Sequence, residues 1–152
     1  MDNNVAMELQ TFGNKREPVE DWDKMYASGK GYKKAAHNAR NRPAVFTPSI
    51  VRNICAMGIE SYFMAVFMHR GLLPHNHTMR DLLDYAERLI SIEPSLRESM
   101  LKIDTQMQLC SLDNIKLTEP LPGDIPLFLK ALDDVAAIAD GELGSDAVSP
   151  HT

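Results

Sequence analysis

Residues 47–71 decide the fold, and they read TPSIVRNICAMGIESYFMAVFMHRG. Thr47 suits the N-cap of a helix, Pro48 suits its first position, and Gly71 suits the left-handed residue that ends it. Between these ends the apolar residues leave almost no polar face, which is typical of a helix buried on all sides. At about 1.5 Å per residue such a helix is roughly 34 Å long. The stretch therefore predicts a long central helix in a water-soluble bundle.

A membrane span is the alternative for this stretch, and the sequence argues against it. The longest unbroken apolar run within it is seven residues, whereas a membrane span needs roughly 18. Four polar residues interrupt the apolar pattern: Arg52, Asn53, Glu60 and Ser61.

The region before the central helix predicts more helix. Residues 18–28 and 32–41 favour this conformation, but Gly29 and Gly31 interrupt the run. Because glycine destabilises a helix interior, the region is either one kinked helix or two short helices.

The region after the central helix predicts three further helices. Thr78 and Ser95 are each followed three residues later by an acid, which is the spacing of a capping box. The helix that begins near Ser95 has apolar positions at helical spacing as far as Cys110. A last helix should begin near Pro126 and end at Gly141.

Length, composition and patterning describe one helical domain. The chain has 152 residues, 44% hydrophobic and 24% charged, with no alternating strand pattern. We expect an all-α fold, a four- to five-helix up-and-down bundle with a long buried central helix. The domain should cover residues 18–140, with disordered segments at 1–17 and 141–152.

The cysteines and the N-terminal residues indicate the cellular compartment in which the protein lies. Cys55 and Cys110 form no CxxC pair and no cysteine-rich spacing, so a reducing environment fits best. The first ten residues have no basic residue and no apolar core of a signal peptide. We therefore expect a cytoplasmic protein.

The charges of the chain are divided along its length. Residues 24–80 hold nine Lys or Arg against one acid, whereas residues 81–152 hold five against fourteen acids. Such asymmetry marks either a basic binding face or two halves of one bundle that attract each other. We favour the second interpretation, because charged helix faces are usually solvated surfaces or structural contacts.

One basic face has the geometry of a phosphate-binding surface. Lys33, His37 and Arg40 are spaced at i, i+4 and i+7, so they share one side of a helix. Tyr32 beside them could stack on a base. A net charge of −5 and a single interleaved aromatic residue give nucleic-acid binding only weak support.

Glu60 lies in the middle of the apolar helix. A buried ionised carboxylate costs several kcal/mol unless it is paired or hydrogen-bonded. We expect a partner from the first helical region, or a backbone or hydroxyl donor. A structural buried acid is the preferred interpretation, because one acid without a base makes a poor catalytic pair.

His69, His75 and His77 gather near one loop. A His-x-His pair can bind a metal, but the third and fourth ligands are missing from the neighbourhood. We therefore expect no metal and no cofactor. His69 suits the negative end of a helix dipole, and His77 suits the end of the loop.

Two motifs carry a resemblance to a known family. Residues 59–65 read IESYFMA with Gly71 downstream, and a second motif follows, formed by Pro74, His77, Met79, Leu82 and Leu83. They resemble the HEPN family, small helical domains often found beside minimal nucleotidyltransferases and in toxin and antiviral systems. In that family the central helix commonly reads Ala-Glu-x-Ala-Leu-Lys-Ala before a Gly turn, and the next helix opens with Pro, His and spaced apolar residues. Met64 replaces the familiar Lys.

The resemblance implies a homodimer formed through the long helices, with a nucleotidyltransferase as a partner protein. It further implies a non-catalytic interaction module that binds a partner protein or a nucleotide-type ligand. The residues expected to carry this binding are Lys33, His37, Arg40 and Arg70, together with the loop histidines.

Ribonuclease members of the family carry Arg-x4-6-His near the start of a late helix. The corresponding residues 110–116 hold neither Arg nor His. Arg70 with His75 or His77 meets the spacing, but across the loop after the central helix. The alternative function is thus a metal-independent ribonuclease in which Arg70 orients a phosphate and His75 or His77 is the acid–base catalyst.

Overall fold

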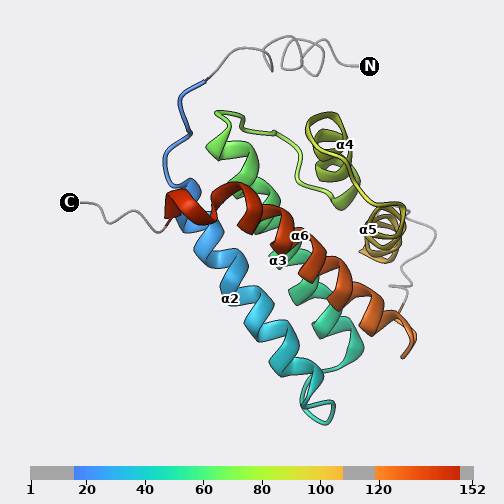
Figure 1. Cartoon of the computed structure of the whole chain (residues 1–152). Helices are drawn as coiled ribbons and strands as arrows, with labels where there is room; N and C mark the ends of the chain where they lie inside the picture. The colour runs from blue at the N-terminus through green and yellow to red at the C-terminus, as the bar shows by residue number, and fades with distance from the viewer. Residues whose placement is uncertain (1–15, 108–118, 148–152) are drawn as a thin grey trace.

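The computed structural model describes residues 16–107 and 119–147, and over these ranges it contains helices and no strand (Figure 1). This confirms the expected all-α bundle. Five helices pack together: α2 (Trp22–Arg40), α3 (Pro48–His69), α4 (Met79–Leu89), α5 (Pro94–Met107) and α6 (Asp124–Ala147).

Helix α3 forms with the ends that its sequence predicts. The Thr47 hydroxyl accepts a hydrogen bond from the Ile50 amide at 3.3 Å, and Gly71 has a left-handed φ of 78°. Most of α3 is buried against α2, α4 and α6. The central position predicted for this helix is therefore confirmed.

Helix α3 has the length and composition of a membrane span. In the structure, however, 72% of its apolar window is buried among the other helices. A core helix of a soluble bundle passes the same test of length and composition.

Helices α2, α3 and α6 form the body of the bundle. Tyr26 bonds to Asp140 and His37 bonds to Asp133, so α6 runs antiparallel to α2. Because α2 and α3 form a hairpin, α6 runs parallel to α3. In Figure 1, α4 and α5 are seen almost end-on beside this body.

Two glycines let these three helices approach closely. A methyl group on Gly29 of α2 would lie 2.8 Å from the Tyr62 ring of α3, and one on Gly58 would lie 2.6 Å from Leu132 of α6. Both distances are shorter than any stable carbon contact. At Gly29 the neighbour is a buried aromatic ring that has no room to move, whereas at Gly58 it is the end of a flexible leucine side chain, so the contact of α2 with α3 depends most on Gly29.

The structure decides between the two alternatives for the first helical region in favour of a single helix. Helix α2 is continuous from Trp22 to Arg40, and Gly29 and Gly31 lie inside it without ending it. The packing of Gly29 against Tyr62 compensates for the poor helix propensity of glycine.

The predicted end of the last helix is wrong. Helix α6 continues past Gly141 to Ala147, so part of the expected disordered tail is helical. Leu143 is fully buried, and Glu142 pairs with Arg70 at the end of α3. These tertiary contacts stabilise the last turns beyond the glycine.

The two predicted capping boxes differ in outcome. The Thr78 hydroxyl accepts from the Asp81 amide at 3.1 Å and donates to the Asp81 carboxylate at 2.6 Å, so Thr78 is confirmed as the N-cap of α4. Helix α5 begins at Pro94, so Ser95 lies inside its first turn. The predicted extension to Cys110 lies outside the described residues, as do residues 1–15 and 148–152.

A buried polar network fixes the start of α6. The Asp124 carboxylate pairs with Lys102 at 2.6 Å and accepts from the Leu121 amide at 2.9 Å. Gln106 donates to Asp124 at 3.2 Å and accepts from Arg52 of α3 at 3.4 Å. The hydrogen bond from Lys102 lowers the pKa of Asp124. The network thus joins α3, α5 and α6 at one end of the bundle.

Replacement of each of two glycines in α2 by alanine tests the close contact between α2 and α3. Gly29→Ala should destabilise the fold by about 1–3 kcal/mol, because the methyl group overlaps the buried Tyr62 ring. Gly31→Ala is the matched control, since no atom lies within 4 Å of its methyl group, and it should stabilise the helix by about 0.5–1 kcal/mol. Urea denaturation measures both, and equal effects of the two changes would contradict the predicted contact.

Candidate functional site

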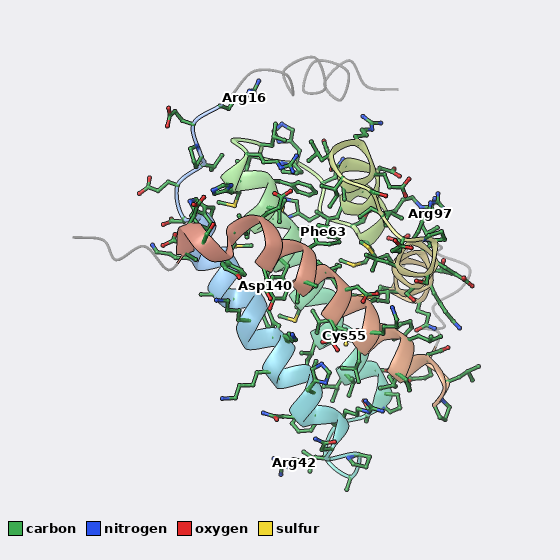
Figure 2. All side chains as sticks on the ribbon, viewed as in Figure 1. Arg16, Arg42, Cys55, Phe63, Arg97 and Asp140 are labelled. Carbon is green, nitrogen blue, oxygen red and sulfur yellow. The ribbon has the colours of Figure 1, made fainter. Side chains whose placement is uncertain are left out.

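A hollow rich in lysine lies where α2 passes α6. It has a volume of about 320 Å³, and six side chains from three helices line it: Lys30, Lys33, Lys34, His37, Tyr62 and Asp140. We call it the lysine hollow. Figure 2 shows Asp140 on α6, beside α2.

Helical spacing explains how α2 contributes four of these residues. Lys30, Lys33, Lys34 and His37 recur every three or four residues, so they lie on one side of the helix. Gly29 brings this part of α2 onto Tyr62, which lies at the base of the hollow.

The four predicted binding residues are only partly brought together. Lys33 and His37 line the hollow, as their shared face predicted. Arg40 is exposed at the last position of α2 and is not part of the lining. Arg70 pairs with Glu142 at the other end of α2 and α3. Lys33, His37 and Arg40 therefore share helix α2, whereas Arg70 lies apart from them, and the role of the four residues in binding stays a prediction.

Hydrogen bonds hold the walls of the hollow. The Tyr26 hydroxyl donates to Asp140 at 2.5 Å, and the His37 Nε2 lies 2.7 Å from a carboxylate oxygen of Asp133. The Lys30 ammonium lies 4.2 Å from the centre of the Tyr26 ring, within range of a cation–π contact. The positions of Lys30, His37 and Asp140 are therefore set by neighbours.

The tyrosines beside the hollow stay protonated over a wide pH range. Burial, with smaller effects of Asp140 and Asp133, raises the pKa of Tyr62 to about 12. Burial and the bond to Asp140 raise the pKa of Tyr26 as well. Both phenols are therefore neutral near pH 7, and Tyr62 offers the hollow a hydroxyl group.

The excess of cations makes the hollow suitable for an anion. Three lysines line it against the single carboxylate of Asp140, and that carboxylate already accepts from Tyr26. A ligand with several negatively charged oxygens, such as a phosphate, fits this charge. Within the described ranges no group of three or more His, Cys, Asp or Glu could hold a metal ion.

Glu60 is not the buried acid that the sequence predicts. Its side chain is 37% exposed, and its partner is His77 of the loop after α3, with Nδ1 at 3.1 Å from the carboxylate. Position 60 faces this loop and not the first helix. Since His77 Nε2 also donates to the Pro74 carbonyl at 2.9 Å, the contact holds the loop against α3.

The candidate catalytic residues of the ribonuclease alternative have protein partners. Arg70 donates from Nε to Glu142 at 3.1 Å and from Nη2 to the same carboxylate. His77 bonds on both ring nitrogens, and His75 is exposed on the loop. The ribonuclease thus stays a prediction, and the contacts of Arg70 and His77 do not favour it.

His69 lies in the last turn of α3, as expected, and it also contacts two other helices. Its Nε2 lies 2.8 Å from Asp146 of α6, and its ring meets the Trp22 ring edge to face at 4.7 Å. The side chain therefore joins α2, α3 and α6 instead of only complementing a helix dipole.

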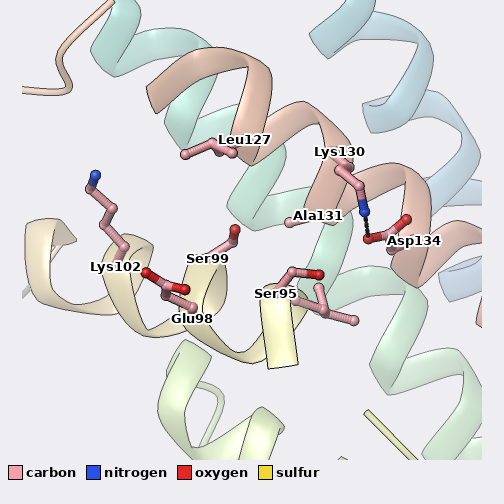
Figure 3. Close-up of a pocket in the computed structure, with 9 residues that line it drawn as sticks. Ser95, Glu98, Ser99, Lys102, Leu127, Lys130, Ala131 and Asp134 are labelled. Carbon is pink, nitrogen blue, oxygen red and sulfur yellow. Dashed lines mark hydrogen bonds and ion pairs between the residues drawn. The ribbon is translucent and has the colours of Figure 1, made fainter. Parts of the chain in front are cut away.

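A second hollow of about 220 Å³ lies between α5 and α6 (Figure 3). Its lysines are neutralised, because Lys130 pairs with Asp134 at 2.7 Å and Lys102 pairs with Asp124 at 2.6 Å. This hollow is therefore less suited to an anion than the lysine hollow.

Sequence reasoning missed the acidic side of the site. Asp133 and Asp140 come from α6, about a hundred residues after the lysines. Their i, i+7 spacing indicates a shared helical face, but nothing in that spacing indicates which helix the face would meet.

Comparison with models of known families, with characterised proteins and with solved structures found no match. The resemblance to HEPN domains therefore stays a prediction from short motifs.

The raised tyrosine pKa predicts a loss of stability at high pH. The unfolded chain releases the Tyr62 proton from about pH 10, whereas the folded chain keeps it until about pH 12. Between these values the free energy of unfolding should fall as pH rises, by about 1.4 kcal/mol per pH unit from this group.

Urea denaturation of the wild type and of Tyr62→Phe from pH 8 to pH 11 measures this loss. The variant keeps the buried ring but has no proton to release, so its decline above pH 10 should be shallower. Parallel curves for the two proteins would contradict the assignment.

Proposed function

We propose that the chain is a non-catalytic helical binding module, resembling HEPN domains, that holds a phosphate-bearing, nucleotide-type ligand in the lysine hollow. The observation that carries this proposal is the convergence of three lysines and His37 on one hollow with a single carboxylate in its lining.

The pairing of the lysines supports the proposal. Outside the lysine hollow, Lys24, Lys102 and Lys130 each pair with an aspartate. Within the described residues Lys33 and Lys34 have no such ion pair. Their positive charges are therefore available to a ligand, and a Lys ammonium binds phosphate as a point charge.

The size of the hollow limits the ligand. At about 320 Å³ it lies at the lower end of the range for small-molecule sites. It suits one phosphate-bearing group with its sugar better than a long strand. Tyr62 can donate to a phosphate oxygen, and the free oxygen of Asp140 can accept from a sugar hydroxyl.

Removal of the unpaired lysines tests the proposed binding. With adenosine diphosphate as the probe, Lys33→Met and Lys34→Met should each weaken binding about tenfold, the effect of losing roughly 1.4 kcal/mol. Isothermal titration calorimetry at low salt measures the dissociation constants. Higher salt should weaken binding to the wild type, because the attraction is electrostatic.

Lys130→Met is the matched control, since Lys130 pairs with Asp134 outside the lysine hollow. It should leave the dissociation constant unchanged. Failure of the wild type to bind, or equal loss in all three variants, would contradict the proposal.

The resemblance adds two proposals about partners, a homodimer and a nucleotidyltransferase that binds the module. Ile50 and Met57 lie two turns apart on α3 and are 40% and 44% exposed. An exposed apolar face on the long helix is consistent with contact to a second copy.

Solution mass tests the homodimer. We expect twice the chain mass of 17.0 kDa at micromolar concentration, and Met57→Glu should shift the protein to the monomer. Leu127→Glu, at an exposed apolar position of α6, should keep the dimer. A wild type that stays monomeric would exclude this proposal.

A further inference from the structure

His37 differs from the other described histidines in its surroundings. His77 uses both ring nitrogens in contacts with the protein, and His69 lies against Trp22 at the far end of α2. His37 has one bond, from Nε2 to Asp133, and its Nδ1 has no partner within the described ranges. It is also the histidine that lines the lysine hollow.

The contact with Asp133 fixes the tautomer of His37. A carboxylate accepts hydrogen bonds, so the proton lies on Nε2 and the lone pair lies on Nδ1. Side chains in a helix lean toward its N-terminus, which directs His37 toward Lys33 and Lys34 one turn earlier. His37 thus lines the same hollow as Lys33 and Lys34, which have no ion pair within the described residues.

We propose that His37 accepts a phosphoryl group on Nδ1 from an acyl phosphate bound in the lysine hollow. This inference rests on the proposed function, because the lysines must hold the phosphoryl oxygens. The product is a modified chain, one phosphoryl group per His37, and no turnover is implied.

The step balances without a proton transfer. The Nδ1 lone pair forms a bond to phosphorus while the bond from phosphorus to the acyl oxygen breaks, and its electron pair leaves with the carboxylate product. His37 keeps its proton on Nε2 and becomes an imidazolium, whose charge is balanced by Asp133. Lys33 and Lys34 balance the charge of the phosphoryl oxygens.

A nucleophile suits the hollow better than an acid–base pair. Cleavage of a phosphate ester needs a second group to protonate the poor leaving group. The hollow holds one imidazole, and the Asp140 carboxylate is engaged with Tyr26. An acyl phosphate needs no such acid, because its leaving group is a stable carboxylate.

Incubation of the full chain with acetyl phosphate at neutral pH tests the proposal. Intact mass should show the gain of one phosphoryl group, and fragmentation should place it on His37. The group should be lost in acid and kept in alkali, as expected for a phosphorus–nitrogen bond. His37→Gln should abolish the gain, and Asp133→Asn should slow it at least tenfold.

His75→Gln is the matched control, since His75 is an exposed loop histidine outside the hollow. It should gain the group at the wild-type rate. Because the His37 and Asp133 side chains are 38% and 41% exposed, their variants should stay folded, which circular dichroism checks.

Binding of adenosine diphosphate separates this inference from the proposed function. A wild type that binds the nucleotide but gains no phosphoryl group would overturn the inference alone. A gain spread equally over His37 and His75 would overturn it as well, and absence of nucleotide binding would overturn the proposed function.

Discussion

Gly29 lies directly against the ring of Tyr62, and the rest of the bundle depends on this contact. A single methyl group at position 29 would overlap the ring. Without that group, α2 lies close enough to α3 for α6 to contact both helices. Tyr26 and His37 of α2 then lie within hydrogen-bonding distance of Asp140 and Asp133 of α6. The lysine hollow is therefore a consequence of helix packing, not of a local motif.

The divided charges of the chain meet across the packed helices. Within the described residues, contacts of basic side chains with carboxylates join the first half to the second half, and they include His37–Asp133, His69–Asp146, Arg70–Glu142 and Arg80–Asp104. The halves thus attract each other, as expected. Lys33 and Lys34 form no such pair within the described residues, so a local excess of positive charge remains at the hollow. Contacts with the acidic half and a local excess of positive charge coexist on α2.

The functional proposals follow from which side chains already have partners. Arg70 and His77, the pair that satisfies a ribonuclease spacing, are engaged with Glu142 and Glu60. Within the part of the chain that the structure describes, His37 has a partner on one ring nitrogen only, and Lys33 and Lys34 beside it form no ion pair. A motif search weighs residue types and spacing, whereas the availability of an atom depends on the whole fold. The geometry therefore brings Lys33 and His37 of the predicted basic face together in one hollow, and it gives Arg70 and His77 of the ribonuclease alternative partners within the protein.

Local rules of the chain determined where α3 begins and ends, that it is buried, and that no strand forms over the described ranges. Caps, apolar pattern and glycine stops act within a few residues, so they can be read without a fold. Only the tertiary structure decided that Gly29 lies inside one helix, that α6 passes Gly141, and that Glu60 faces a loop. Each of these depends on a contact between residues far apart in sequence: Tyr62 against Gly29, Arg70 with Glu142, and His77 with Glu60. The position of Asp133 and Asp140 beside the lysine hollow was decided in the same way. Their spacing places both carboxylates on one face of α6, but only the packing of the helices shows that this face contacts α2.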